Sequence, residues 1–146
     1  MKKTSKLISF FLSIIMVLSI IPLTASAEEN AVSYDYTVIS EEENTCRLNS
    51  HSGIALTDGD TLVFPSEVNG YKVVELADGI CRYSSAKKVV VPDSVIRIGE
   101  AFDNHNGLFS VTLGAGVSDF DSENFRGMNS LKEFIVSENN PYISSV

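Results

Sequence analysis

Short apolar segments recur through the second half of the chain, separated by longer polar stretches. The four segments are Leu62–Phe64, Val89–Val91, Val111–Leu113 and Phe134–Val136, and their last positions lie 27, 22 and 23 residues apart. A repeat of this length is typical of a solenoid, in which each coil buries its apolar side on its neighbours. Solenoids usually present extended binding surfaces, so the pattern favours recognition over catalysis.

The polar stretches also carry apolar residues at matching places. In each unit one core position is followed six residues later by a second, and three residues after that by the strand: Ile80, Ala86 and Val89; Phe102, Leu108 and Val111; Phe125, Leu131 and Phe134. The longer first unit has its extra residues around Glu67–Tyr71, where Asn69–Gly70 is a strong turn signal. We expect a loop insertion that leaves the stacked strands undisturbed.

The strand pattern predicts a β-rich parallel solenoid of about three repeats over residues 61–146. Inward positions recur at period two in each strand. The connections hold Pro, Gly, Asp and Asn and are too short for a regular helix; Gly99–Phe102 and Ser122–Phe125 could each form one helical turn at most. We therefore expect a parallel sheet on one face, with loops, short strands and single helical turns on the other.

One stretch has a familiar pattern. The run from Val89 to Phe102 resembles the BspA-type leucine-rich repeat of bacterial surface proteins, and Val136–Tyr142 resembles the way a repeat of that family ends. The resemblance covers roughly residues 61–146, with two of the units degenerate. It implies a leucine-rich repeat fold (formally α/β) in an extracellular or surface-attached protein that recognises other macromolecules, with no catalytic motif to transfer.

Residues 28–60 do not follow the repeat. The segment 31–39 alternates and is rich in β-formers, Glu41–Asn44 is a polar turn, and 45–48 could return as a second strand. Because an open solenoid end exposes core and unpaired strand edge, we interpret residues 28–60 as an N-terminal β-hairpin cap.

The first 27 residues have the features of a secretory signal peptide. A basic start is followed by an apolar run over 7–23 and by the small-residue site Ala25–Ala27. An uncleaved anchor is the alternative, but the apolar run is at the short limit for spanning. Cleavage would leave no membrane span and a secreted, extracellular or cell-surface chain with eight basic and 19 acidic residues. That charge opposes binding to nucleic acid or an anionic membrane.

The sequence offers little chemistry. Cys46 and Cys81 could form a disulfide or remain two separate buried thiols. His51 and His105 stand in polar contexts and are interpreted as solvated loop residues, without the nucleophile and acid that a catalytic histidine needs. We find no metal-binding pattern, expect no cofactor, and predict that the protein is not an enzyme; a small hydrolase would need a nucleophile–base pair that the sequence does not offer.

The outward side of the parallel sheet is the candidate binding surface. Alternation turns seven residues outward, and the stacking of strands aligns four of them in one column. The seven are Val63, Lys88, Val90, Ser110, Thr112, Glu133 and Ile135. An exposed, apolar-to-neutral column with charged margins suits an extracellular protein ligand in an adhesion-type role. The alternative for these positions is that β-branched residues occur there only because they favour strands. The alternative function is a non-catalytic wall- or carbohydrate-associated module of a larger secreted enzyme.

The C-terminal side of the repeats shows no polar terminal helix. The last strand, Phe134–Val136, should have a neighbour on one side and a free edge on the other. Free edges with apolar residues invite pairing with another chain. We therefore predict self-association through this end, and interpret the chain as a stub of a longer repeat protein, although a weak cap by the last residues is an alternative.

Overall fold

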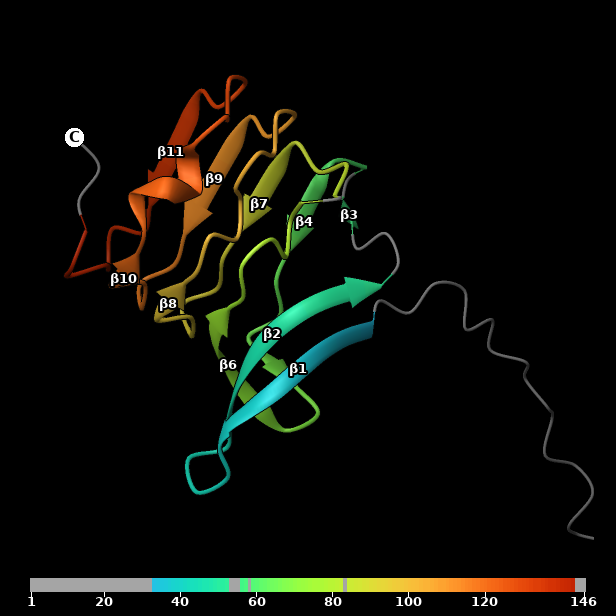
Figure 1. Cartoon of the computed structure of the whole chain (residues 1–146). Helices are drawn as coiled ribbons and strands as arrows, with labels where there is room; N and C mark the ends of the chain where they lie inside the picture. The colour runs from blue at the N-terminus through green and yellow to red at the C-terminus, as the bar shows by residue number, and fades with distance from the viewer. Residues whose placement is uncertain (1–32, 53–55, 58, 83, 144–146) are drawn as a thin grey trace, which may run out of the picture.

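The computed structural model describes residues 33–52, 56–57, 59–82 and 84–143. It is a parallel β-solenoid of four coils with an antiparallel hairpin at its N-terminal end and almost no helix, as predicted (Figure 1). The predicted signal peptide over residues 1–27 lies outside the described residues, and so does the start of the predicted cap. Among the described residues, no helix is long and apolar enough to cross a membrane.

Sheet B carries the repeating strands that the sequence predicted. Its order is β11-β9-β7-β4-β3, from β3 (Leu56–Thr57), β4 (Thr61–Val63), β7 (Lys88–Val90), β9 (Ser110–Leu113) and β11 (Glu133–Val136). Four of these strands run parallel and pair in register, namely β4, β7, β9 and β11. The short β3 pairs with β4 in the antiparallel direction. Three repeat units thus link four parallel strands.

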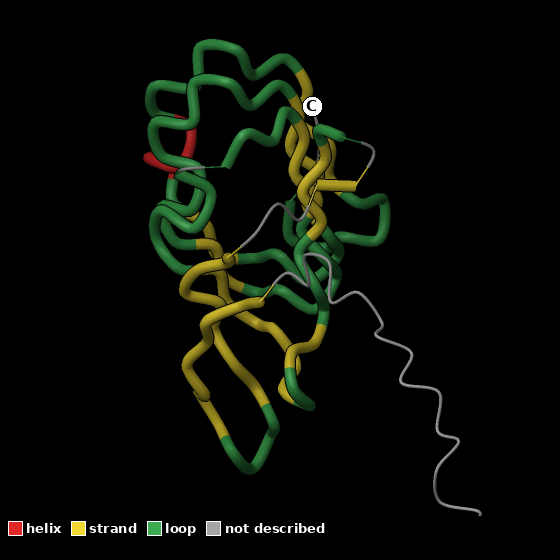
Figure 2. Tube along the Cα trace, turned by 90° about the vertical axis from the view of Figure 1, so that its right-hand side faces the viewer, coloured by secondary structure: helices red, strands yellow, loops and turns green. Residues whose placement is uncertain are grey.

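The opposite side of the coils is a second sheet, sheet A, rather than mostly loops. It consists of β1 (Ser33–Ser40), β2 (Thr45–Ser52), β6 (Tyr71–Leu76), β8 (Arg97–Ile98) and β10 (Asp119–Phe120), in that order, with β5 (Glu67–Val68) paired to β6. The predicted short strands therefore align into a ladder of their own. Figure 2 shows the two sets of strands on two sides of the coils, with loops between them.

The predicted helical turns have different outcomes. Ser122–Phe125 forms the 3₁₀ helix η1, begun by Asp121, whose side chain accepts a hydrogen bond from the backbone N–H of Glu123. The segment Gly99–Phe102 is a turn, not a helix. The predicted insertion is a small hairpin between β5 and β6, where Asn69 and Gly70 have φ values of 51° and 86°. Both residue types tolerate this left-handed conformation.

The predicted hairpin cap is present, and it is joined to the solenoid through its second strand. β1 and β2 are antiparallel around the turn at 41–44, with two irregularities of register, and β2 pairs in parallel with β6. Cys46 and Leu48 of β2 are fully buried, so the hairpin supplies core as well as a covered edge. The division into a cap and a repeat domain at residue 60 remains a prediction.

The core lies between the two sheets and follows the predicted offsets. Ile80, Phe102, Ala86 and Leu108 are buried, whereas the equivalent Phe125 and Leu131 of the last coil are only half-buried. The rings of Phe120, Phe125 and Phe134 gather there, with centroid separations between 5.2 and 6.4 Å. The apolar interior therefore becomes more accessible toward the C-terminal end of the described solenoid.

Polar side chains tie successive coils together at their corners. The carboxylate of Asp78 accepts from the backbone N–H of Glu100 at 2.9 Å, and that of Asp93 from Ala115 at 2.7 Å. The side-chain amide of Asn140 donates to the carbonyl oxygens of Gly114 and Val117, both at 2.9 Å. These bonds satisfy backbone groups that the short strands leave unpaired.

Candidate functional site

The outer face of sheet B carries the column that alternation predicted. Val63 is opposite Val90, Val90 opposite Thr112, and Thr112 opposite Ile135. We call these four residues the apolar stripe. Its ends, Val63 and Ile135, are 43% and 47% exposed, and its middle residues are half-buried between them. Three of the four residues are apolar and the third in the row is a threonine, and such a mainly apolar row on an outer face is a feature of surfaces that contact other proteins.

The row beside the stripe differs from the prediction at one residue. Lys88, Ser110 and Glu133 are in register, and Lys88 and Glu133 are exposed as expected. Ser110 is only 5% exposed. Its short side chain stands between two long ones on the neighbouring strands, so it is covered although its strand position points outward. Ser110 is therefore removed from the candidate contact residues.

The outer face of sheet A carries a charged column that sequence reasoning missed. Arg47 is opposite Glu75, Glu75 opposite Arg97, and Arg97 opposite Asp119. We call these four residues the charge ladder. Arg97 Nε lies 3.4 Å from Asp119 Oδ2, while both side chains stay largely exposed. The 22-residue spacing of positions 75, 97 and 119 could have revealed three residues of the charge ladder from the sequence. Arg47 belongs to the ladder only because β2 pairs with β6.

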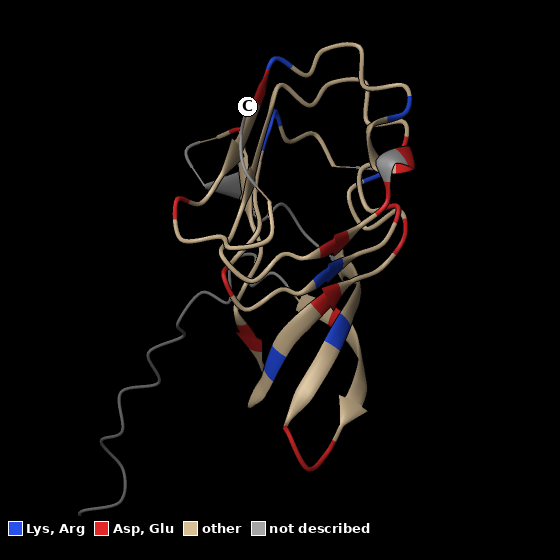
Figure 3. Ribbon diagram, turned by 90° about the vertical axis from the view of Figure 1, so that its left-hand side faces the viewer, with Lys and Arg blue, Asp and Glu red and all other residues tan. Residues whose placement is uncertain are grey.

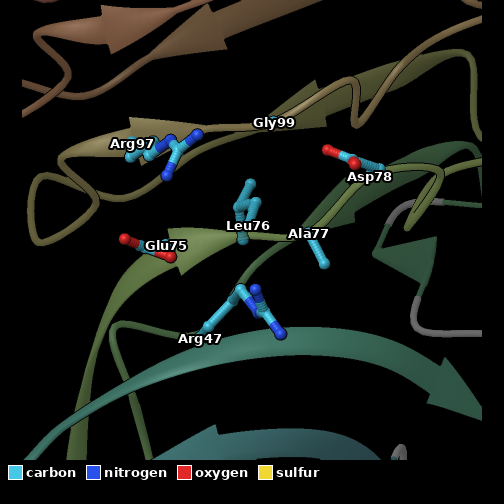
Figure 4. Close-up of a pocket in the computed structure, with 7 residues that line it drawn as sticks. All are labelled: Arg47, Glu75, Leu76, Ala77, Asp78, Arg97 and Gly99. Atoms are coloured by element: carbon cyan, nitrogen blue, oxygen red, sulfur yellow. The ribbon is translucent and has the colours of Figure 1, made fainter. Parts of the chain in front are cut away.

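Two open hollows lie along the charge ladder. The first, of about 280 Å³, is lined by Arg47, Glu75, Leu76, Ala77, Asp78, Arg97 and Gly99 (Figure 4). The second, of about 600 Å³, lies between Asp78, Arg97, Ile98, Gly99, Glu100, Asp119, Phe120 and Asp121. In Figure 4 the side chains of Glu75 and Arg97 lie on one side of the hollow and that of Asp78 on the other. Both hollows are shallow and have mostly polar walls, unlike a pocket for an apolar small molecule.

Both histidines differ from the solvated loop residues that were predicted. His105 is 7% exposed, and His51 belongs to β2 and is half-buried, 6.4 Å from the Tyr34 ring between centroids.

Asp103, close to His105 in the sequence, is also buried, with Arg82 Nη2 and Arg126 Nε at 3.8 and 3.7 Å from its two oxygens. Arginines of successive coils thus lie within ion-pair distance of one buried carboxylate. Within the described residues, no group of three His, Cys, Asp or Glu side chains is placed to hold a metal ion.

Cys46 and Cys81 are free thiols, so the disulfide alternative is not formed in this structure. Cys46 pairs with Val73 near the start of β6, whereas Cys81 lies beyond the end of that strand. Both are fully buried, including Cys81, which directly follows the core residue Ile80. Burial raises the pKa of both thiols, which disfavours the reactive thiolate.

Known structures resemble this arrangement of coils. Over 70% of the chain and 46% of its own length, the leucine-rich repeat protein TpLRR of T. pallidum superposes with a TM-score of 0.57 and 26% identity. The chain has the leucine-rich repeat fold. A leucine-rich cell surface protein of Faecalibacterium prausnitzii matches 73% of the chain over 42% of its own length, with a TM-score of 0.50 and 19% identity. A leucine-rich repeat protein of Bacteroides capillosus matches 71% of the chain over 94% of its own length, with a TM-score of 0.50 and 22% identity.

These likenesses bear on the fold more than on the activity. The chain spans less than half of the T. pallidum and F. prausnitzii proteins. No protein-family model and no curated protein matches the sequence. The leucine-rich repeat proteins it resembles are bacterial, and one is described as a cell surface protein. Repeat proteins of this kind generally bind rather than catalyse.

Proposed function

We propose that this chain is a secreted or cell-surface leucine-rich repeat module of the BspA type, without catalytic activity, that binds an extracellular protein. The contact surface is the apolar stripe, with Lys88 and Glu133 beside it. The observation that carries the proposal is the in-register stacking of Val63, Val90, Thr112 and Ile135 on an outer face. Such a row is costly to leave in water and is stabilised when a partner covers it.

Three further observations support this proposal. The fold is that of bacterial repeat proteins, one of them a cell surface protein. The first 27 residues have the pattern of a signal peptide. The excess of acidic over basic residues opposes nucleic acid as a ligand, because such binding requires a basic footprint.

A pair of matched substitutions tests the contact surface. Ile135→Asp puts a charge in the stripe, and Ile96→Asp puts the same charge on a residue of equal exposure, 48% against 47%, outside the stripe. The purified chain is screened by biolayer interferometry against a panel of extracellular matrix and cell-surface proteins. We expect Ile135→Asp, and more strongly Val90→Asp with Ile135→Asp, to weaken binding at least tenfold. Equal effects of Ile135→Asp and Ile96→Asp, with both variants folded, would contradict the assignment.

The alternative, a carbohydrate-associated module of a larger secreted enzyme, has one observation in its favour. Tyr36 and Tyr71 lie side by side on the hairpin end, 5.8 Å apart between ring centroids. The Tyr71 hydroxyl donates to Glu41 at 2.8 Å, and Asn69 donates to the Tyr36 hydroxyl at 3.4 Å. Half-exposed rings beside polar groups can stack on sugars. Binding to cell-wall glycans that is lost in Tyr36→Ala but kept in Ile135→Asp would favour this second function.

A further inference from the structure

Lysines gather at one margin of the apolar stripe. Outside the first 27 residues the chain has four lysines, and three of them are Lys87, Lys88 and Lys132. We call these three the lysine margin. They lie at the start of the strands of sheet B: the backbone N–H groups of Lys87 and Lys88 donate to the Asp60 carbonyl, and that of Lys132 donates to the Phe109 carbonyl. Figure 3 shows basic ribbon segments at this end of the sheet.

Backbone hydrogen bonds place these residues in successive coils. The N–H of Phe109 donates to the Lys87 carbonyl at 2.7 Å, so positions 87, 109 and 132 stack in order. Lys132 Nζ lies 5.7 Å from the centre of the Phe109 ring. This cation–π contact keeps the ammonium beside the Phe109 ring without neutralising its charge. The first and third of these coils therefore carry lysines where their strands begin, at one margin of the apolar stripe, and the middle coil carries Phe109.

Among the described residues the three lysines of the margin have no ion-pair partner, a feature that they share with Arg47 and Lys72 but not with the other three arginines. Arg82, Arg97 and Arg126 each pair with a carboxylate. No ion pair to Lys87, Lys88 or Lys132 occurs among the described residues, and all three side chains are exposed. Two acidic residues share the margin, Asp60 and Glu133, which leaves it net positive on an otherwise strongly acidic chain.

We propose that the partner of the sheet B face is an acidic polypeptide segment, with apolar side chains along one side and carboxylates beside them. The inference rests on the proposed function and specifies its ligand. The apolar row would cover the stripe, and the carboxylates would face the lysine margin. The stripe crosses three strand spacings, about 14 Å. A polypeptide fits it better than a polysaccharide or nucleic acid, because only a polypeptide supplies a row of apolar side chains.

A random 12-residue peptide library displayed on phage, selected on the purified chain at low salt, tests this inference. We expect enriched peptides in which Asp or Glu alternates with apolar residues. Dissociation constants of a synthetic consensus peptide are then measured for the wild type and for Lys88→Glu. We expect a loss of roughly tenfold, and up to about a hundredfold for Lys87→Glu, Lys88→Glu and Lys132→Glu combined. Lys72, the one exposed residue of β6 in sheet A, gives the matched control, because Lys72→Glu makes the same charge change.

The outcomes separate the inference from the function on which it rests. Neutral or basic peptides that lose affinity with Ile135→Asp but not with Lys88→Glu would overturn the acidic partner and leave the sheet B face as the binding surface. Equal losses of affinity with Lys88→Glu and Lys72→Glu would show that only the net charge of the protein matters. That result would also overturn the acidic partner. Failure to enrich any peptide, or enriched peptides indifferent to Ile135→Asp, would contradict both proposals.

Discussion

The outer faces of the two sheets are built alike and carry opposite chemistry. Each presents one side chain per coil in a four-residue column, because parallel strands in register align the same position of every coil. The column on sheet B is the apolar stripe, and that on sheet A is the charge ladder. Backbone geometry is thus shared, and only the residue type at one position of each strand separates a surface suited to burial from one suited to water.

This difference is the reason why we propose a partner for sheet B and none for sheet A. Members of the charge ladder alternate in sign, so that Arg97 and Asp119 already interact, and exposed charges are well hydrated without a ligand. The apolar stripe has no such internal compensation, since Val63 and Ile135 leave nearly half of their surface in water. In our proposal, one side of the solenoid contacts the partner and the other side stays in water.

The largest expected effect concerns the reactivity of the two thiols, one on β2 of sheet A and the other beyond the end of β6. Because Cys46 and Cys81 are fully buried, labelling by Ellman's reagent requires local or global opening. We expect the native protein to react more slowly than the denatured one by a factor of roughly 10³ or more. Denaturation without reductant should release two thiols. Recovery of none would show that the disulfide forms after all.

Two glycines in equivalent corner turns should differ in their tolerance of a side chain. A Cβ at Gly114, after β9, would lie 2.5 Å from backbone atoms of Pro92 and Asp93, whereas a Cβ at Gly99, after β8, would meet the Asp78 carboxylate. Backbone cannot move aside, but a side chain can rotate. We expect Gly114→Ala to lower the free energy of unfolding by about 3 kcal/mol and Gly99→Ala by about 1 kcal/mol, measured by urea denaturation. Equal losses would mean that the corners are equally adaptable.

The C-terminal edges of the two sheets should also behave differently. β11 is four residues long and includes the apolar residues Phe134 and Ile135. β10 has only two residues, and one of them is the charged Asp119. Asn140 ties the segment after β11 to the carbonyls of Gly114 and Val117. We expect Asn140→Ala to cost roughly 1–3 kcal/mol and to increase self-association through β11 in sedimentation velocity at rising concentration.

The neighbouring Asn139 supplies the control for the edge prediction. Its side chain is exposed, so Asn139→Ala should leave both stability and sedimentation unchanged. Ile135→Lys in the Asn140→Ala background should restore the monomer, because a charged residue on a free edge disfavours strand pairing. A monomeric Asn140→Ala variant at high concentration would show that the described edge is already protected.

The smallest effect is expected for the charge ladder. Arg97→Glu would bring three carboxylates together with Glu75 and Asp119, but position 97 and Asp119 are largely exposed and Glu75 is only half-buried. We expect a loss below about 1 kcal/mol, reduced further at 0.5 M NaCl, with Arg97→Gln intermediate. A loss of several kcal/mol in thermal or urea unfolding would mean that the ladder is needed for stability, and would remove the contrast between the two faces.

The sequence alone was sufficient for the features that repeat along the chain. The spacing of Val91, Leu113 and Val136 predicted the parallel strands, and alternation placed Val63, Val90, Thr112 and Ile135 in one outward column. Asn69–Gly70 predicted the turn, because few residue pairs accept its left-handed backbone. These features are local or periodic, so that one chain segment contains the information for each.

Only the tertiary structure decided what depends on neighbours from distant segments. Ser110 is buried although strand alternation turns it outward, and His105 is buried although its sequence context is polar. The charge ladder depends on the pairing of β2 with β6, which places Arg47 next to Glu75 from outside the repeat. The two cysteines are likewise separated by the length of β6. Burial and strand pairing arise when coils stack on one another. The order of residues within a single coil does not determine which residues of other coils will cover it.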